Sequence, residues 1–268
     1  MTEPVTCPIS GSPMERVFSE TVLGKYQVSY YYSPASGLLR TEAPYWLDEA
    51  YREAIGDADT GLVARNIRNS QLLEVLLACL SLDKGKVVDV AGGYGLLTRL
   101  MRDKGFDCYT TDKYCQNLFA RTFEPGTDFQ ADALCAFEVL EHLENPLQFL
   151  QTVFTQYRCK TLIFSTLTFA GAIPARDWWY YAFEEGQHIT FYQPRTLALL
   201  AARLGCNYYR VNPGVHVITD IKIPSIGRLI LRNRYLRKAY TLAVRHRRRK
   251  LSRTWDDHLQ IRSLDKTD

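Results

Sequence analysis

The sequence lacks several features that would place the protein in a membrane or outside the cell. Its 268 residues contain no apolar run of membrane-spanning length and no signal-peptide pattern. The seven cysteines are odd in number and scattered, which argues against a disulfide framework and favours reduced thiols. We therefore expect a cytoplasmic protein. A hydrophobic content of 46% is enough to build the core of one enzyme-sized domain with appendages.

Acidic residues are missing from one long stretch. Residues 221–255 contain twelve Lys or Arg and no Asp or Glu, whereas residues 1–220 carry a net charge of −6 and residues 256–268 a net charge of −2. Apolar residues occur here at roughly helical spacing, at Leu229, Ile230, Leu236, Tyr240 and Val244. The pattern predicts a helical tail that binds an anionic partner: a membrane surface, a phosphorylated substrate or RNA. The alternative is a solvated helix whose basic face pairs with the acidic body.

Thiols are missing from a pattern that would otherwise indicate a zinc ribbon. Cys7-Pro-Ile-Ser10-Gly and Ser33-Pro-Ala-Ser36-Gly have the shape of paired C-P-x-C-G knuckles, but three of the four thiols are replaced by serine. Serine is a poor zinc ligand, so we expect no structural zinc. Packing of nearby tyrosines would replace the metal, namely Tyr26, Tyr30, Tyr31 and Tyr32. The alternative is a pair of unrelated proline turns.

A glycine-rich turn follows a buried strand at residues 87–95, VVDVAGGYG. Gly92, Gly93 and Gly95 carry no side chain and can take positive φ angles, so a ligand can approach the backbone. The dinucleotide fingerprint G-x-G-x-x-G needs a further glycine where this chain has Thr98, so the fit to NAD is poor.

The turn resembles the first motif of the class I S-adenosylmethionine (SAM) methyltransferases, Asp-x-Gly-x-Gly-x-Gly. Asp89, Gly93 and Gly95 match this pattern, and Ala91 replaces the first glycine. We expect Ala91 to be tolerated through a negative φ angle. The resemblance implies a SAM-binding role for the following residues: Asp89, Ala91, Gly92, Gly93, Tyr94, Gly95, Asp112 and Phe137.

Asp112 ends a second short strand, 17 residues beyond Gly95. In nucleotide sites, a carboxylate at this place accepts hydrogen bonds from ribose hydroxyls, and by resemblance Asp112 holds the SAM ribose. The alternative is that Asp112 caps a helix beginning at Lys113. The acidic residue that binds the adenine amine in the family has no clear counterpart.

Strands and helices alternate along the rest of the chain. Apolar periodicity predicts strands at 87–90, 131–137, 160–164 and 215–223, and helices at 65–82, 96–103 and 194–204. This alternation predicts an α/β fold with a doubly wound, mostly parallel, Rossmann-like sheet, in which ligands bind beyond the carboxyl ends of the strands. We expect an N-terminal region at 1–60, a methyltransferase domain at 61–223 and a basic tail at 224–268.

Glu138-Val-Leu-Glu141-His142 directly follows the predicted strand at 131–137. If it begins a helix, these three side chains project from one face. They could bind a divalent metal, or His142 could act as a general base. The alternative is a helix N-terminus at which the two glutamates complement the helix dipole and the histidine packs.

The phrase FEVLEHLENP resembles a methyltransferase group that includes ubiquinone-pathway O-methyltransferases, deoxysugar C-methyltransferases and small-RNA 3′-end methyltransferases. The resemblance implies a metal site formed by Glu138, Glu141, His142 and, from a later loop, His188, which would hold a divalent ion such as Mg²⁺. It equally allows metal-free catalysis, with His142 as the base and Glu141 orienting it.

Four consecutive aromatic residues precede His188: Trp178, Trp179, Tyr180 and Tyr181. Flat aromatic faces suit stacking on sugars, bases or phenolic rings, so we expect them to line the acceptor pocket, unless they form a packed lid. The sequence favours a SAM-dependent methyltransferase acting on a hydroxyl oxygen of a small molecule or glycan. Alternatives are a sugar C-methyltransferase, an RNA methyltransferase that uses the basic tail, and a non-catalytic adaptor that docks on membranes or partners.

Overall fold

The computed structural model describes residues 5–51, 60–248 and 250–264. The chain divides into two compact units. The first consists of Met1–Asp57, Phe137–Thr155 and Phe164–Asp220, and the second of Ala58–Ala136, Gln156–Ile163 and Ile221–Asp268. Each unit combines distant parts of the sequence, so the domain boundaries expected above stay a prediction. Residues 52–59 of the expected N-terminal region, and 249 and 265–268 of the expected tail, lie outside the described residues.

A six-stranded sheet has the strand order β5-β4-β6-β7-β10-β9. In the second unit, β4 (Lys86–Val90) pairs in parallel with β5 (Asp107–Thr111) and with β6 (Ala133–Ala136). In the first unit, β10 (Val215–Thr219) pairs antiparallel with β9 (Asn207–Asn212). The boundary between the units falls within β7 (Leu162–Ser165). This confirms the expected doubly wound, mostly parallel sheet, in which the middle strands are continuous apolar runs.

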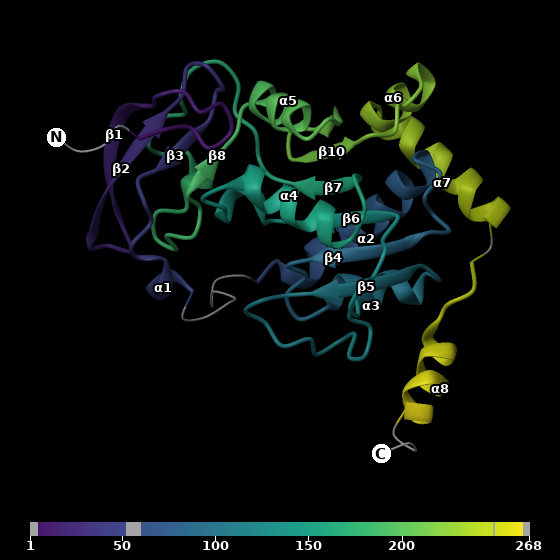
Figure 1. Cartoon of the computed structure of the whole chain (residues 1–268). Helices are drawn as coiled ribbons and strands as arrows, with labels where there is room; N and C mark the ends of the chain where they lie inside the picture. Colours follow the sequence, from purple (N-terminus) through teal and green to yellow (C-terminus); the bar gives the residue numbers. More distant parts are fainter. Residues whose placement is uncertain (1–4, 52–59, 249, 265–268) are drawn as a thin grey trace. The chain divides into compact units, whose positions relative to one another are not determined.

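In the second unit, helix α2 (Leu62–Cys79) contacts three other helices: α3 (Leu96–Asp103), α6 (Ser225–Arg232) and α7 (Arg234–Arg248). A last helix, α8 (Thr254–Leu264), completes the tail (Figure 1). Among the described residues, no helix combines the length and the hydrophobicity that crossing a bilayer requires. The expected helices at 65–82 and 96–103 are confirmed as α2 and α3.

The first unit contains α1 (Leu47–Ala50), α5 (Pro194–Arg203) and all but the last residue of α4 (Pro146–Gln156). The expected helix at 194–204 is confirmed as α5. It begins with Pro194 after a capping box in which Gln193 and Thr196 exchange side-chain to backbone hydrogen bonds. Its end is marked by Gly205, which has a φ angle of 68°.

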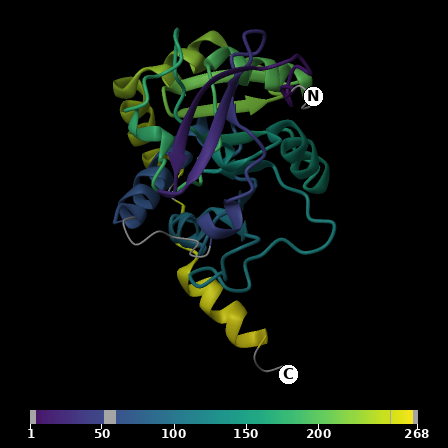
Figure 2. The same cartoon turned by 90° about the vertical axis from the view of Figure 1, so that its left-hand side faces the viewer.

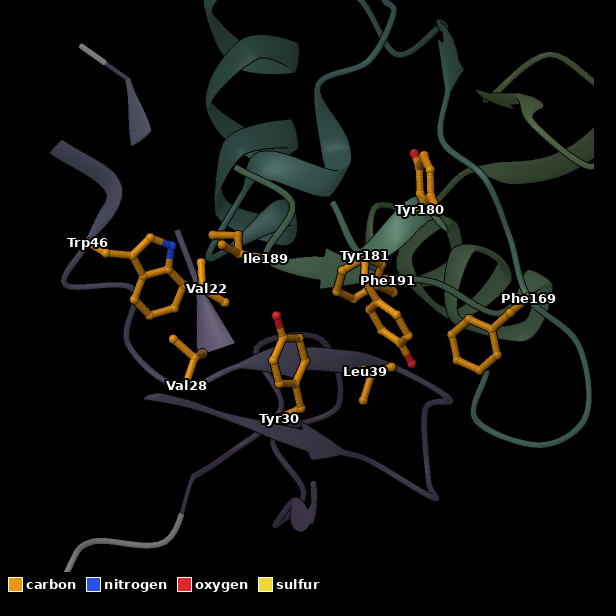
Figure 3. Packing of buried hydrophobic residues seen from close by; sticks show 10 residues of the cluster. All are labelled: Val22, Val28, Tyr30, Leu39, Trp46, Phe169, Tyr180, Tyr181, Ile189 and Phe191. Atoms are coloured by element: carbon orange, nitrogen blue, oxygen red, sulfur yellow. The ribbon is translucent and has the colours of Figure 1, made fainter. Parts of the chain in front are cut away.

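A second sheet of the first unit is antiparallel, with the order β1-β2-β3-β8. Its strands are β1 (Glu15–Val22), β2 (Tyr26–Tyr32), β3 (Leu39–Thr41) and β8 (Thr190–Phe191), and Figure 2 shows the β1–β2 hairpin face-on. Tyr30 stacks on Phe18 with 4.5 Å between ring centroids. Tyr30 belongs to a hydrophobic core of this unit, whose buried residues Figure 3 shows, and Phe18 packs against that core.

The two serine-substituted knuckles lie together beside this sheet. Cys7 Sγ is 3.2 Å from Ser36 Oγ, and Ser33 Oγ is 3.2 Å from Ser12 Oγ. Cys7, Ser33 and Ser36 are almost fully buried. Hydrogen bonds therefore join the knuckles here, and the likeness to a zinc ribbon stays a prediction.

Within the second unit, a buried ion pair joins α8 of the tail to α3. The Arg102 guanidinium of α3 donates two hydrogen bonds to the Asp257 carboxylate of α8, at 2.8 and 2.6 Å, and Arg99 lies 2.9 Å from the same carboxylate. Arg102 and Asp257 are 1% and 2% exposed. These cations lower the pKa of Asp257 although burial opposes them. Arg102 also lies 3.6 Å above the centre of the Phe123 ring.

We predict that Asp257→Ala lowers the free energy of unfolding by about 3 kcal/mol, because the buried Arg102 charge then loses its two-point partner and keeps only Asp107, 3.3 Å away. The matched control is Asp256→Ala, which removes an exposed carboxylate one residue away and should cost no more than about 0.5 kcal/mol. Urea unfolding of both variants measures the difference. Equal stabilities would show that the pair does not anchor α8.

Candidate functional site

The glycine turn of the second unit connects β4 to α3. Gly93 and Gly95 take φ angles of 58° and 80°, as expected, but Ala91 has a φ angle of 55°. The expectation of a negative φ at Ala91 is therefore wrong. The backbone of Ala91 adopts the left-handed conformation, which costs a residue with a Cβ atom about 1–2 kcal/mol of conformational free energy. Open space lies where a Cβ atom on Gly93 would be, so a ligand can approach the backbone there.

The Asp89 carboxylate packs directly against Gly92 of the turn. This carboxylate is buried, and Cys135 Sγ donates a 3.4 Å hydrogen bond to Oδ1. A Cβ on Gly92 would collide with Asp89 Oδ2 and Thr110 Oγ1, so only glycine fits above this carboxylate. Burial raises the pKa of Asp89 to about 7.

Asp112 closes the turn from the end of β5. Its Oδ2 accepts a 2.9 Å hydrogen bond from the Gly93 N–H. Its Oδ1 accepts hydrogen bonds from the N–H groups of Tyr114 and Cys115, at 2.7 and 2.8 Å. The capping contacts of the alternative interpretation are therefore present, although no helix begins at Lys113. The ribose-binding role of Asp112 stays a prediction.

The remaining expected cofactor residues are Tyr94 and Phe137. The Tyr94 carbonyl accepts hydrogen bonds from the N–H groups of Leu118 and Phe119, both at 3.0 Å, and its side chain is half-buried. Phe137 belongs to the first unit and is half-buried. That the glycine turn and the Glu-His motif lie at the same edge of the sheet remains a prediction.

In the first unit, the Glu-His motif does not begin the expected helix. Residues Leu140–His142 form a single 3-10 turn, and α4 begins only at Pro146. Glu138 takes a φ angle of 57°. Its exposed side chain accepts a 2.6 Å hydrogen bond from Ser165 Oγ, and its N–H donates to the same oxygen. The condition for a shared helix face is therefore not met, because no α-helix begins at Glu138.

Glu141, His142 and His188 lie together. One candidate ligand atom from each residue lies within 4.8 Å of those of the other two, and the two imidazole centroids are 4.9 Å apart. Glu141 is fully buried, whereas both histidines are half-buried. The structure thus brings together three of the four residues expected to hold a metal, and Glu138 is not in this group.

Backbone carbonyls fix the orientation of both histidines. His142 Nδ1 is 3.0 Å from the Gln187 carbonyl, and His188 Nδ1 is 2.8 Å from the Tyr180 carbonyl. A carbonyl oxygen only accepts hydrogen bonds, so each Nδ1 carries a proton, and Nε2 is the ring nitrogen that remains for a ligand. Burial, assisted by His188, lowers the pKa of His142 to about 3. His142 is therefore a neutral imidazole at physiological pH.

Glu141 is held on one side only. Its Oε1 accepts a 2.7 Å hydrogen bond from the Tyr180 hydroxyl, while its buried Oε2 has no hydrogen-bond partner among the described residues. Burial raises the pKa of Glu141, and His188 and Tyr180 oppose that shift. Leaving a buried polar atom unpaired costs about 1–3 kcal/mol, so Oε2 is suited to a ligand that the chain itself does not supply.

Tyr180 contacts two members of this cluster, an arrangement that the sequence did not indicate. Its hydroxyl orients Glu141 and its backbone carbonyl orients His188, so one residue positions two members of the cluster. Figure 3 shows this hydroxyl pointing away from Tyr30 and Leu39. The only sequence signal was its place in the aromatic segment before His188.

The expected substrate residues separate into two kinds. Trp178, Tyr180 and Tyr181 pack into the hydrophobic core of the first unit, as the packed-lid alternative predicts. Trp179 is 74% exposed, and its ring centroid lies 5.3 Å from that of Tyr180. Trp179 is thus the member of this segment that is free to contact a ligand.

Comparison with known proteins decides the family. Residues 64–211 match a family described as "Methyltransferase domain". The chain belongs to this methyltransferase family. The match confirms the expectation of a SAM-dependent methyltransferase with the Rossmann-like class I fold. No curated protein sequence matches the chain.

Solved structures of methyltransferases are similar to the chain at low identity. Magnesium protoporphyrin IX methyltransferase from Synechocystis PCC 6803 with bound SAM is 15% identical, covers 65% of this chain and 90% of its own, and has a TM-score of 0.38. Mitomycin 7-O-methyltransferase MmcR is 15% identical, covers 65% and 59%, and has a TM-score of 0.41. The methyltransferase domain of bacterial CtHen1 is 24% identical, covers 57% and 98%, and has a TM-score of 0.36.

We predict that Tyr180→Phe lowers the free energy of unfolding by about 1–3 kcal/mol at neutral pH, because Glu141 Oε1 and the Leu167 N–H both lose the Tyr180 hydroxyl as a hydrogen-bond partner. Tyr31→Phe makes the same chemical change at a half-buried tyrosine and should shift stability by about 0.5 kcal/mol or less. Chemical denaturation of the two variants compares them. If Tyr180→Phe is as stable as Tyr31→Phe, the hydrogen bond from Tyr180 to Glu141 does not contribute to stability.

Proposed function

We propose that this methyltransferase transfers a methyl group from SAM to a hydroxyl oxygen of a small molecule or glycan, assisted by a divalent metal at Glu141, His142 and His188. The observation that carries the proposal is the cluster of Glu141, His142 and His188, whose candidate ligand atoms lie within 4.8 Å of one another. Within it, the buried Glu141 Oε2 has no hydrogen-bond partner among the described residues. Metal-binding histidines usually donate their other ring N–H to a carbonyl or carboxylate, and both histidines do so here. The residues therefore fit a metal ion.

The donor set limits which metal fits. Two imidazole nitrogens and one carboxylate oxygen suit a first-row divalent ion such as Mn²⁺, Fe²⁺ or Zn²⁺ better than Mg²⁺, which prefers oxygen ligands and keeps several waters. The bound metal would lower the pKa of an acceptor hydroxyl. The neutral state of His142 suits a ligand better than a general base, because a base works best with a pKa near the operating pH.

In the second unit, the glycine turn would hold SAM. Gly92 lets the backbone pass close above the buried Asp89, and Gly93 leaves open space for a ligand. SAM supplies an activated methyl group, so the protein needs chiefly to align the acceptor and help remove its proton. The exposed Trp179 supports an acceptor with a flat ring or a sugar face, because it offers a surface on which such a group can stack.

We predict that His188→Ala lowers methyl transfer by about 100-fold or more while SAM affinity, measured by calorimetry, changes by less than about twofold. Activity is read as labelled product after incubating a cell extract with the protein and methyl-labelled SAM. The matched control is His258→Ala, which removes an exposed histidine of α8 and should leave both readouts unchanged.

Chelation separates the metal proposal from metal-free catalysis. Product formation should fall after extensive chelation and return when Mn²⁺ is added, and the His188→Ala variant should not recover. Full activity after chelation would overturn the metal assignment and leave the methyl transfer standing. Absence of SAM binding by the wild-type protein would overturn the proposed function as a whole.

A further inference from the structure

The basic tail carries an unusual concentration of exposed apolar side chains. Of the fifteen large hydrophobic side chains exposed in the described part of the chain, eight lie within residues 226–259. Five of these occupy α6 and α7, namely Ile226, Leu229, Tyr235, Leu236 and Leu242. Contiguous exposed apolar groups on a folded protein usually mark an interaction site.

The two most exposed apolar residues of α7, Tyr235 and Leu242, lie on the side of the helix opposite to the one that contacts α2. Arg237 and Tyr240 are half-buried, and the Tyr240 hydroxyl is 3.4 Å from the Ala78 carbonyl of α2. Tyr235 and Leu242, seven residues apart, share the opposite helix face and are 70% and 68% exposed. These two side chains are therefore not buried by packing against the core of the second unit.

Basic side chains accompany them. Arg228, Arg234 and Lys238 are exposed, and none of the three forms an ion pair with an acidic side chain among the described residues. This observation argues against the alternative stated above, in which the basic face of a solvated helix forms ion pairs with the acidic body of the protein. On α7, Lys238 lies between Tyr235 and Leu242 on the same face, and all three side chains are exposed, so positive charge and apolar surface face solvent together.

We propose that α6 and α7 form a docking surface for an anionic lipid bilayer, with Ile226, Leu229, Tyr235 and Leu242 entering the headgroup–acyl boundary and Arg228, Arg234 and Lys238 contacting anionic headgroups. Amphipathic helices that lie in a membrane interface combine these two kinds of side chain. RNA would attract the same cations, but aliphatic side chains such as Leu242 gain little from a hydrated phosphate backbone. The apolar half of the surface therefore favours the bilayer. This proposal is independent of the metal and of the acceptor.

Vesicle co-sedimentation at physiological ionic strength tests the proposal. Wild-type protein should bind phosphatidylcholine–phosphatidylglycerol vesicles and should not bind pure phosphatidylcholine vesicles. The double reversal Arg234→Glu with Lys238→Glu should weaken binding by about 25-fold or more, at about fivefold per charge. Leu242→Gln should weaken it by about tenfold.

The matched control is the double reversal Lys84→Glu with Arg121→Glu, which makes the same charge change at two exposed residues outside the tail and should alter binding by no more than about twofold. Circular dichroism checks that each variant is folded. Hydrogen exchange on the unmodified protein provides a second measurement that needs no variant: anionic vesicles should protect α6 and α7.

Three results would overturn the proposal. They are no binding of the wild-type protein to anionic vesicles, an equal loss in the control pair, and wild-type affinity in Leu242→Gln. Tight binding to a single-stranded RNA probe without vesicle binding would assign the surface to nucleic acid instead.

Discussion

The candidate site depends on a carboxylate from which water is excluded. Glu141 is fully buried, and the chain supplies a hydrogen bond to only one of its oxygens. Burial at this position penalises the ionised form. A cation at the free oxygen would serve as its missing partner and would also compensate the buried negative charge. The arrangement therefore favours a bound metal over an empty cluster. The hydrophobic core of the first unit holds Tyr180 in place, and Tyr180 holds Glu141 and His188.

In the second unit, the candidate site is formed by the backbone of the glycine turn. Asp89 is buried under the glycine turn, Asp112 accepts hydrogen bonds from the turn and from the chain that follows β5, and the backbone at Ala91 is strained. Strain of this kind persists where the surrounding structure fixes the conformation, and it is common at ligand-binding turns. The turn is therefore held in one shape by contacts on both sides.

Much of this architecture could be predicted from the sequence because local pattern and tertiary packing agree. The helix α3 has the predicted bounds, since Gly95 starts it in a left-handed conformation and its apolar residues keep helical spacing. The buried strands β4, β6 and β7 lie within a few residues of their predicted ranges. Strand β9 was missed because its alternating burial is weak and its pairing with β10 is set by tertiary context.

The site was predictable only in part. The meeting of Glu141, His142 and His188 agrees with the family resemblance, but Glu138 turns toward Ser165 because its backbone takes a positive φ angle that no local rule assigns to glutamate. The double role of Tyr180 depends on a backbone carbonyl, and sequence patterns carry no information on where a carbonyl points. Histidine tautomers are likewise set by contacts between distant residues.

Anomalous diffraction from crystals grown with Mn²⁺ would show whether the cluster binds a metal ion. We expect an anomalous peak contacted by Glu141 Oε2 and by the Nε2 atoms of His142 and His188, with both Nδ1 atoms still directed at their backbone carbonyls. A map without a peak at this cluster, in crystals where Mn²⁺ is present, would contradict this expectation.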